Sequence, residues 1–94
     1  MKEICDIYTK LFEEFLAENL PVDDFEAAYF MRFKNETQML DDRLYDVLED
    51  VFGDLDSFTH DAELSADKPD FYLDEPGLRR RVRRALERLL VLSR

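Results

Sequence analysis

The sequence predicts an all-α protein that folds as an antiparallel four-helix bundle, on three observations. Four segments repeat apolar residues at intervals of three and four, which is the spacing of one helix face. The composition, with 46% hydrophobic residues and only two glycines, is typical of a compact helical protein rather than a β-rich or disordered one. The connections are short or moderate, so successive helices pack antiparallel. At 94 residues, we expect positions 1–94 to form a single domain.

The first two helices are predicted from apolar stripes on either side of a proline. The first is expected from about Lys2 to Glu18, and the break at residues 19–21 puts Pro21 near the first position of the second helix, where a proline is favoured. The second helix then runs to about Lys34. Its inner stripe is Val22, Phe25, Tyr29 and Phe33, whereas Phe30 and Met31 lie off that stripe.

The last two helices are predicted to begin with the same signal, an aspartate N-cap next to an apolar pair that can act as a hydrophobic staple. The caps are Asp41 and Asp74, and the staple pairs are Leu40 with Tyr45 and Leu73 with Leu78. Between these helices, residues 59–73 are expected to be a polar loop, anchored to the bundle by its Phe71-Tyr72 pair. The final helix turns Leu78, Val82, Ala85, Leu86 and Leu89 inward and Arg79, Arg80, Arg83 and Arg84 toward solvent or toward acids of neighbouring helices.

The net charge of −10 is concentrated in the middle of the chain. Residues 1–40 carry nine acids and four bases (−5), residues 41–75 thirteen and two (−11), and residues 76–94 one and seven (+6). Such a field repels nucleic acid and anionic membranes and attracts a basic protein, although an acidic surface also serves solubility alone. In the third helix, Leu44, Val47, Leu48, Val51, Leu55 and Phe58 face inward and Asp42, Asp46, Glu49 and Asp56 face outward.

Gly53 lies near the centre of this acidic face and lowers helix stability by about 1 kcal/mol relative to alanine. Either the bundle tolerates this glycine, or the missing side chain lets a partner approach the helix backbone closely.

Several classes of function are disfavoured. The arginines of the last helix have no aromatic residues or nucleic-acid motif among them, so we do not expect nucleic-acid binding. No segment has the run of about 20 apolar residues of a membrane span. The lone Cys5, expected on a helix flank, can form no intramolecular disulfide, which favours a reducing compartment; we therefore expect a cytoplasmic protein.

No catalytic, metal or cofactor site is predicted. His60 and Asp61 are adjacent and Ser57 is close in sequence, but no glycine-shaped backbone is available for the oxyanion hole that nucleophilic catalysis needs. A calcium loop beginning at Asp54 requires an oxygen ligand where Phe58 stands and a glycine where Thr59 stands. Both requirements fail.

The chain resembles the colicin D-type immunity proteins, the bacterial self-protective colicin-like immunity family. The matching stretches are PVDDFEAAYFMRFKN, LDDRLYDVLEDVFGDLDSF and FYLDEPGLRRRVRRALERL, so the resemblance covers most of the chain from Leu20 onward. Each stretch alone is a generic amphipathic helix. The specific feature is their order, in which an acidic third helix is followed by an LDEPGL-type start to a basic last helix.

The resemblance implies an antitoxin that binds the basic nuclease domain of a cognate toxin, with tRNA as the toxin's substrate in the colicin D case. It implies contacts by Asp56 and Asp61 and aligns Glu49 and Asp50 with further acids; the charge pattern adds Asp46 and Glu63. We expect a monomer that forms a 1:1 complex. The partner is a colicin, a contact-dependent inhibition toxin or another secreted nuclease.

Three departures from the family pattern leave the partner's identity open: Gly53, a long loop at residues 59–73, and Pro21 in place of a small hydroxyl cap. The alternative function is a non-inhibitory acidic adaptor that uses Phe30 and Met31 for self-association or partner binding.

Overall fold

A computed structural model describes residues 2–36, 40–68 and 70–93 of the chain. The described residues form five helices: α1 (Lys2–Leu16), α2 (Val22–Lys34), α3 (Asp42–Asp56), α4 (Ala62–Asp67) and α5 (Glu75–Leu92). Within the same residues, the only β-type pairing is an isolated bridge between Phe58 and Leu73. The predicted all-α class is confirmed.

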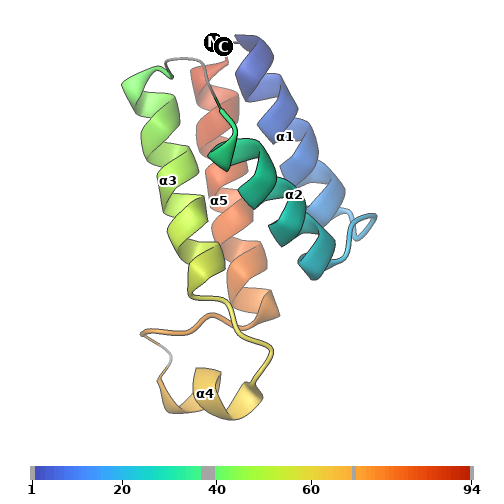
Figure 1. Ribbon diagram of the computed structural model, residues 1–94, viewed down its shortest axis with the longest axis vertical. Coiled ribbons are helices and arrows are strands. Elements are labelled where there is room, and N and C mark those ends of the chain that lie inside the picture. Colours follow the sequence, from blue (N-terminus) through green and yellow to red (C-terminus); the bar gives the residue numbers. More distant parts are fainter. Residues whose placement is uncertain (1, 37–39, 69, 94) are drawn as a thin grey trace.

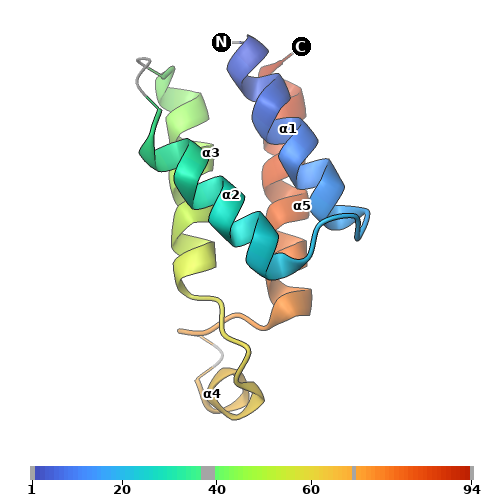
Figure 2. The same ribbon diagram turned by 45° about the vertical axis from the view of Figure 1, so that its right-hand side comes forward.

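The four long helices run alternately down and up, so the chain ends lie together at one end of the molecule (Figure 1). Helix α5 packs against both α1 and α3, and α2 crosses obliquely over the remaining side (Figure 2). The short α4 projects beyond the opposite end of the bundle, which contributes to a long axis of 40 Å against 25 and 24 Å for the other two.

The core lies where the apolar stripes of the long helices meet. Every inward residue predicted for α3 between Leu44 and Leu55 is buried, and so are Leu78, Val82, Ala85 and Leu89 of α5. Cys5 departs from its prediction as a flank residue. The Cys5 side chain, on α1, is completely buried in the core of the bundle. This burial is the main cause of the raised pKa of its thiol.

Helix α2 is attached mainly through large side chains. Phe15 of α1 and Phe25 of α2 stack with their ring centroids 4.3 Å apart. The buried Tyr29 donates a hydrogen bond from its hydroxyl to the backbone carbonyl of Leu48 on α3. Aromatic rings bury a large apolar area while they keep the helix axes apart, so α2 covers the bundle without close backbone approach.

Two of the predicted helix starts are confirmed by the capping geometry. The Asp41 side chain accepts a hydrogen bond from the backbone N–H of Arg43, and the Asp74 side chain accepts one from that of Gly77. The predicted end of the first helix is wrong by two residues. Glu18 has a φ of 64°, and the N–H of Asn19 bonds to the carbonyl of Glu14, which is the left-handed termination that ends α1 at Leu16.

The prediction of a polar loop for residues 59–73 is wrong in part, because this segment contains α4. We call residues 59–68 and 70–72 the arm. Asp61 caps α4, since its carboxylate accepts from the backbone N–H groups of Glu63 and Leu64. The base of the arm is closed by two backbone hydrogen bonds, from Thr59 to the carbonyl of Leu73 and from Leu73 to that of Ser57, each 2.9 Å long.

The predicted anchoring role of the Phe71-Tyr72 pair is also wrong for Phe71, whose side chain is 72% exposed. The contacts that fix the arm come instead from its base. They include the hydrogen bond between His60 and Asp23 in the first turn of α2, with 2.8 Å between Nε2 and Oδ1.

Candidate functional site

The three exposed sides of α3 differ in chemistry, because the helical spacing of its exposed residues places a different kind of side chain on each side. Asp42, Asp46, Glu49, Gly53 and Asp56 are spaced at three and four residues, opposite the buried stripe, and all five are exposed. We call these residues the outward strip. Toward α5, α3 presents Asp50 and Asp54, and toward α2 it presents Tyr45 and Phe52.

The acids of the outward strip have no cationic partner within the part of the chain that the structure describes. Among the residues that the structure describes, no basic side chain makes a salt bridge to Asp46, Glu49 or Asp56, and all three are exposed. Their charges are therefore available to a molecule that binds from outside.

Asp56 occupies the last position of α3, where no basic residue is present. The negative end of the helix dipole disfavours a carboxylate there.

Asp50 was predicted with the same acidic group, but the structure places it on the α5 side. Its carboxylate accepts a hydrogen bond 2.8 Å long from the guanidinium of Arg88, and Asp54 lies 3.9 Å from Arg81. Burial is the main cause that raises the pKa of Asp54, with Arg81 opposing the shift and Asp50 adding to it. These two acids are thus already compensated from within the bundle.

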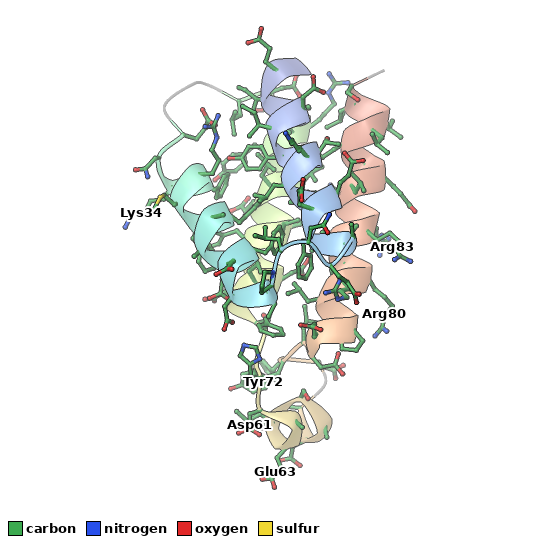
Figure 3. All side chains as sticks on the ribbon, turned by 90° about the vertical axis from the view of Figure 1, so that its right-hand side faces the viewer. Lys34, Asp61, Glu63, Tyr72, Arg80 and Arg83 are labelled. Atoms are coloured by element: carbon green, nitrogen blue, oxygen red, sulfur yellow. The ribbon has the colours of Figure 1, made fainter. Side chains whose placement is uncertain are left out.

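Asp61 and Glu63 lie in the arm, beyond the end of α3 and far from the chain termini (Figure 3). Both are exposed, but they differ in role, because Asp61 uses its carboxylate to cap α4 while Glu63 makes no salt bridge among the described residues. The six predicted contact residues therefore fall into three groups: Asp46, Glu49 and Asp56 on the outward strip, Asp50 on the α5 side, and Asp61 and Glu63 in the arm.

Gly53 stands in the middle of the outward strip with open space around it. A Cβ built on this residue meets no heavy atom within 4 Å, so neither packing nor an unusual backbone angle requires glycine at this position. The open space around Gly53 fits both predictions: the bundle tolerates the glycine, or a partner approaches the backbone here.

The arginines of α5 follow the prediction only in part. Arg80 and Arg83 point away from the bundle (Figure 3). Arg79 does not face solvent freely: its guanidinium lies 4.6 Å from the ring centroid of Phe15 and donates a 3.0 Å hydrogen bond to the Phe15 carbonyl. The interhelical ion pairs are made by Arg81 and Arg88, which sequence reasoning did not single out.

The residues considered for other functions are separated. His60 pairs with Asp23 of α2 rather than with Asp61, so the sequence neighbours do not form a triad. Phe30 is partly buried, with its ring centroid 5.0 Å from that of Phe52, whereas Met31 is 68% exposed. Met31 is therefore the more exposed of these two residues.

In the described parts of the chain, no group of three or more metal-ligating side chains gathers, and no helix has the length and apolar character needed to cross a membrane. The aromatic flank of α3, with Tyr45 and Phe52 seven residues apart, was missed as a binding feature. The sequence shows this spacing, but the prediction used Tyr45 only as the partner of Leu40 in a hydrophobic staple.

A family model described as bacterial self-protective colicin-like immunity matches residues 4–89, nearly the whole chain. No curated protein and no solved structure matches the chain.

Proposed function

This chain belongs to the bacterial self-protective colicin-like immunity family, and from that premise we propose that it is an antitoxin for a bacterial nuclease. It binds the basic nuclease domain of a cognate toxin in a 1:1 complex, as a monomer in the cytoplasm of the cell that it protects. The toxin's substrate is RNA, with tRNA as the class implied by the colicin D-type resemblance.

The mechanism of inhibition follows from what a ribonuclease must do with its substrate. Such an enzyme holds a polyanion in a cationic cleft, so an acidic protein surface of similar reach competes for the same charges. The outward strip from Asp42 to Asp56 advances about 21 Å at about 1.5 Å per residue. Glu63 of the arm adds an exposed negative charge beyond the end of α3.

The observation that carries this proposal is that, among the residues that the structure describes, no basic side chain makes a salt bridge to Asp46, Glu49 or Asp56, although seven basic residues lie between positions 76 and 94 of the sequence. Arg81 and Arg88 compensate the acids on the neighbouring side, which leaves the outward strip as the concentrated negative surface of α3. A fold that only needed solubility has no requirement to keep a carboxylate at the C-terminal end of a helix, as at Asp56.

The test is co-expression of this protein with the product of the adjacent upstream reading frame. We expect the product of that frame to kill cells and fragment tRNA when expressed alone, and cells to survive with intact tRNA when this protein is present. The Glu49→Lys, Asp56→Lys double variant, at equal expression, should lose most of the protection. A toxic product whose action leaves RNA intact would contradict the ribonuclease target.

A further inference from the structure

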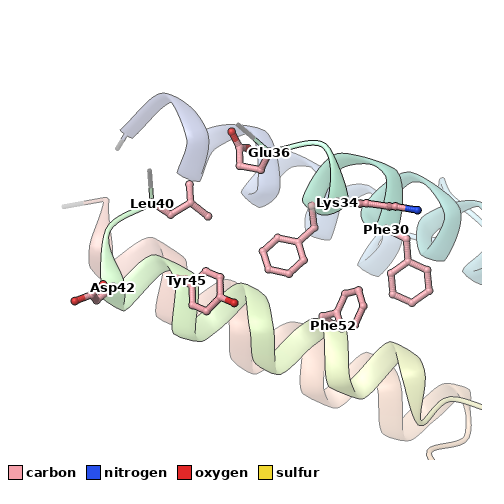
Figure 4. Close-up of a pocket in the computed structure, with 8 residues that line it drawn as sticks. Phe30, Lys34, Glu36, Leu40, Asp42, Tyr45 and Phe52 are labelled. Atoms are coloured by element: carbon pink, nitrogen blue, oxygen red, sulfur yellow. The ribbon is translucent and has the colours of Figure 1, made fainter. Parts of the chain in front are cut away.

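A pocket of about 870 Å³ lies between α2 and α3, beside the outward strip. Its apolar lining is formed by Phe30 and Phe33 of α2, Leu40 before α3, and Tyr45 and Phe52 of α3. Figure 4 shows these rings facing the space between the two helices. The volume falls in the range of pockets that bind small molecules.

The pocket exists because of the way in which α2 is attached. The ring centroids of Phe33 and Tyr45 are 6.0 Å apart and those of Phe33 and Phe52 are 5.7 Å apart, so aromatic side chains bridge the two helices. Such rings leave their edges and faces uncovered where the helix axes stand apart. Tyr45 and Phe52 are 44% and 40% exposed as a result.

The charges around the pocket are unequal from end to end. Asp42 and Glu36 lie near Tyr45 and Leu40 at one end, whereas Lys34 lies near Phe30 at the other (Figure 4). Asp42 is also the first residue of the outward strip and makes no salt bridge among the described residues. The pocket and the outward strip are therefore continuous at the N-terminal end of α3.

Resting on the proposed function, we infer that this aromatic pocket receives an arginine side chain of the toxin's nuclease domain. The guanidinium lies at the Asp42 end over the face of Tyr45, and the aliphatic part of the side chain packs along Phe33 and Phe52. Aromatic faces attract a cation, and the neighbouring carboxylate strengthens that preference. Lys34 excludes a cation from the opposite end, which fixes the direction of the inserted side chain.

The two flanks of α3 lead to the same conclusion. On the α5 side, Arg81 and Arg88 already occupy Asp54 and Asp50, so a further cation gains little there. On the α2 side, an open aromatic surface adjoins Asp42, which makes no salt bridge among the described residues. The toxin therefore meets the α2–α3 edge of the bundle, and the buried arginine is an anchor within a wider electrostatic contact.

The inference is tested without the toxin, by nuclear magnetic resonance with acetyl-Gly-Arg-Gly-amide as the probe and its citrulline counterpart as the neutral isostere. The arginine peptide should shift the ring signals of Tyr45 and Phe52 saturably and bind about fivefold more tightly than the citrulline peptide. The Tyr45→Ala variant should lose most of this binding. The Phe71→Ala variant, which removes an exposed ring from the arm, should bind as the parent does.

Equal binding of the two peptides, unchanged binding by Tyr45→Ala, or the absence of saturable ring shifts would overturn the pocket's assignment. Because cell protection is measured separately, a protein that protects cells but whose pocket ignores the arginine peptide would retain the proposed function and refute only this inference. A protein whose pocket binds the peptide but which protects no cell would refute the antitoxin role instead.

Discussion

At the scale of single residues, replacement of Gly53 is expected to change the stability of the protein and its binding to the toxin in opposite directions. Alanine is favoured over glycine in a helix interior by about 1 kcal/mol, and the Cβ at this position meets nothing within 4 Å. We therefore predict that Gly53→Ala raises the free energy of unfolding by about that amount, measured by urea denaturation. If a partner approaches the backbone here, the same variant binds the toxin more weakly. A variant that gains stability and binds as tightly as the parent would show that Gly53 is only tolerated.

The raised pKa of Asp54 predicts that the stability of the protein depends on pH. Its pKa is raised above 3.8, chiefly by burial, so the folded state holds the proton more tightly than the unfolded state does. The ionised carboxylate therefore costs stability near neutral pH, and this cost disappears as the pH falls through the raised pKa to below 3.8. Asp54→Asn should be more stable than the parent at pH 7, with the difference closing in acid. Thermal unfolding of both proteins from pH 7 to pH 3.5 measures this difference in stability. A difference that widens as the pH falls would contradict the role assigned to Asp54.

At the scale of helices, α3 and α5 are joined by ion pairs as well as by their apolar stripes. Arg81 and Arg88 reach Asp54 and Asp50, whereas Arg80 and Arg84 make no salt bridge among the described residues. Exposed pairs contribute about 0–1 kcal/mol each, so we predict that Arg81→Gln with Arg88→Gln lowers the free energy of unfolding by about 1 kcal/mol at low salt.

The matched control is Arg80→Gln with Arg84→Gln, which changes the net charge equally. Its effect on unfolding should be smaller, and the gap between the two double variants should shrink as salt is added, because salt screens exposed charges. Equal destabilisation by the two pairs would mean that the arginines act through general charge rather than through these contacts.

The helical elements were largely predictable because local signals determine them. Asp41 and Asp74 act as caps through contacts within one turn, and the apolar stripes report burial directly. Helix α4 was missed because its described residues include no buried side chain and it has only six residues, which leaves no apolar periodicity to detect. Its one local signal, the Asp61 cap, was read as a partner contact.

The candidate site was less predictable, because the availability of a carboxylate to a partner depends on whether a basic side chain of another helix lies beside it. The family resemblance grouped Asp50 with Glu49, but the arginines that face Asp54 and Asp50 lie 27 and 38 residues further along the chain (81 − 54 and 88 − 50). The pocket beside α3 likewise depends on how α2 crosses the bundle. Neither feature has a signal within one helix, so only the packed structure reveals them.

At the scale of the whole molecule, the charge of −10 attracts any basic partner, whereas inhibition of the toxin requires direct contacts by the outward strip. Two double variants separate the effects. Glu49→Lys with Asp56→Lys alters the strip, and Glu3→Lys with Glu13→Lys alters exposed residues of α1; each replaces two negative charges by two positive ones. The strip variant should remain folded, since Lys at position 56 suits the end of a helix.

The most direct test is the dissociation constant of each double variant for the purified nuclease domain of the toxin, measured by isothermal titration calorimetry at physiological salt. Desolvated charge pairs cost about 2–5 kcal/mol when one partner is lost, whereas distant charges alter mainly the association rate. We therefore predict a loss of affinity of about thirtyfold or more for the strip variant and of less than about threefold for the α1 variant. Equal losses from the two variants, or a strip variant that binds as the parent does, would contradict the claim that this surface inhibits the toxin.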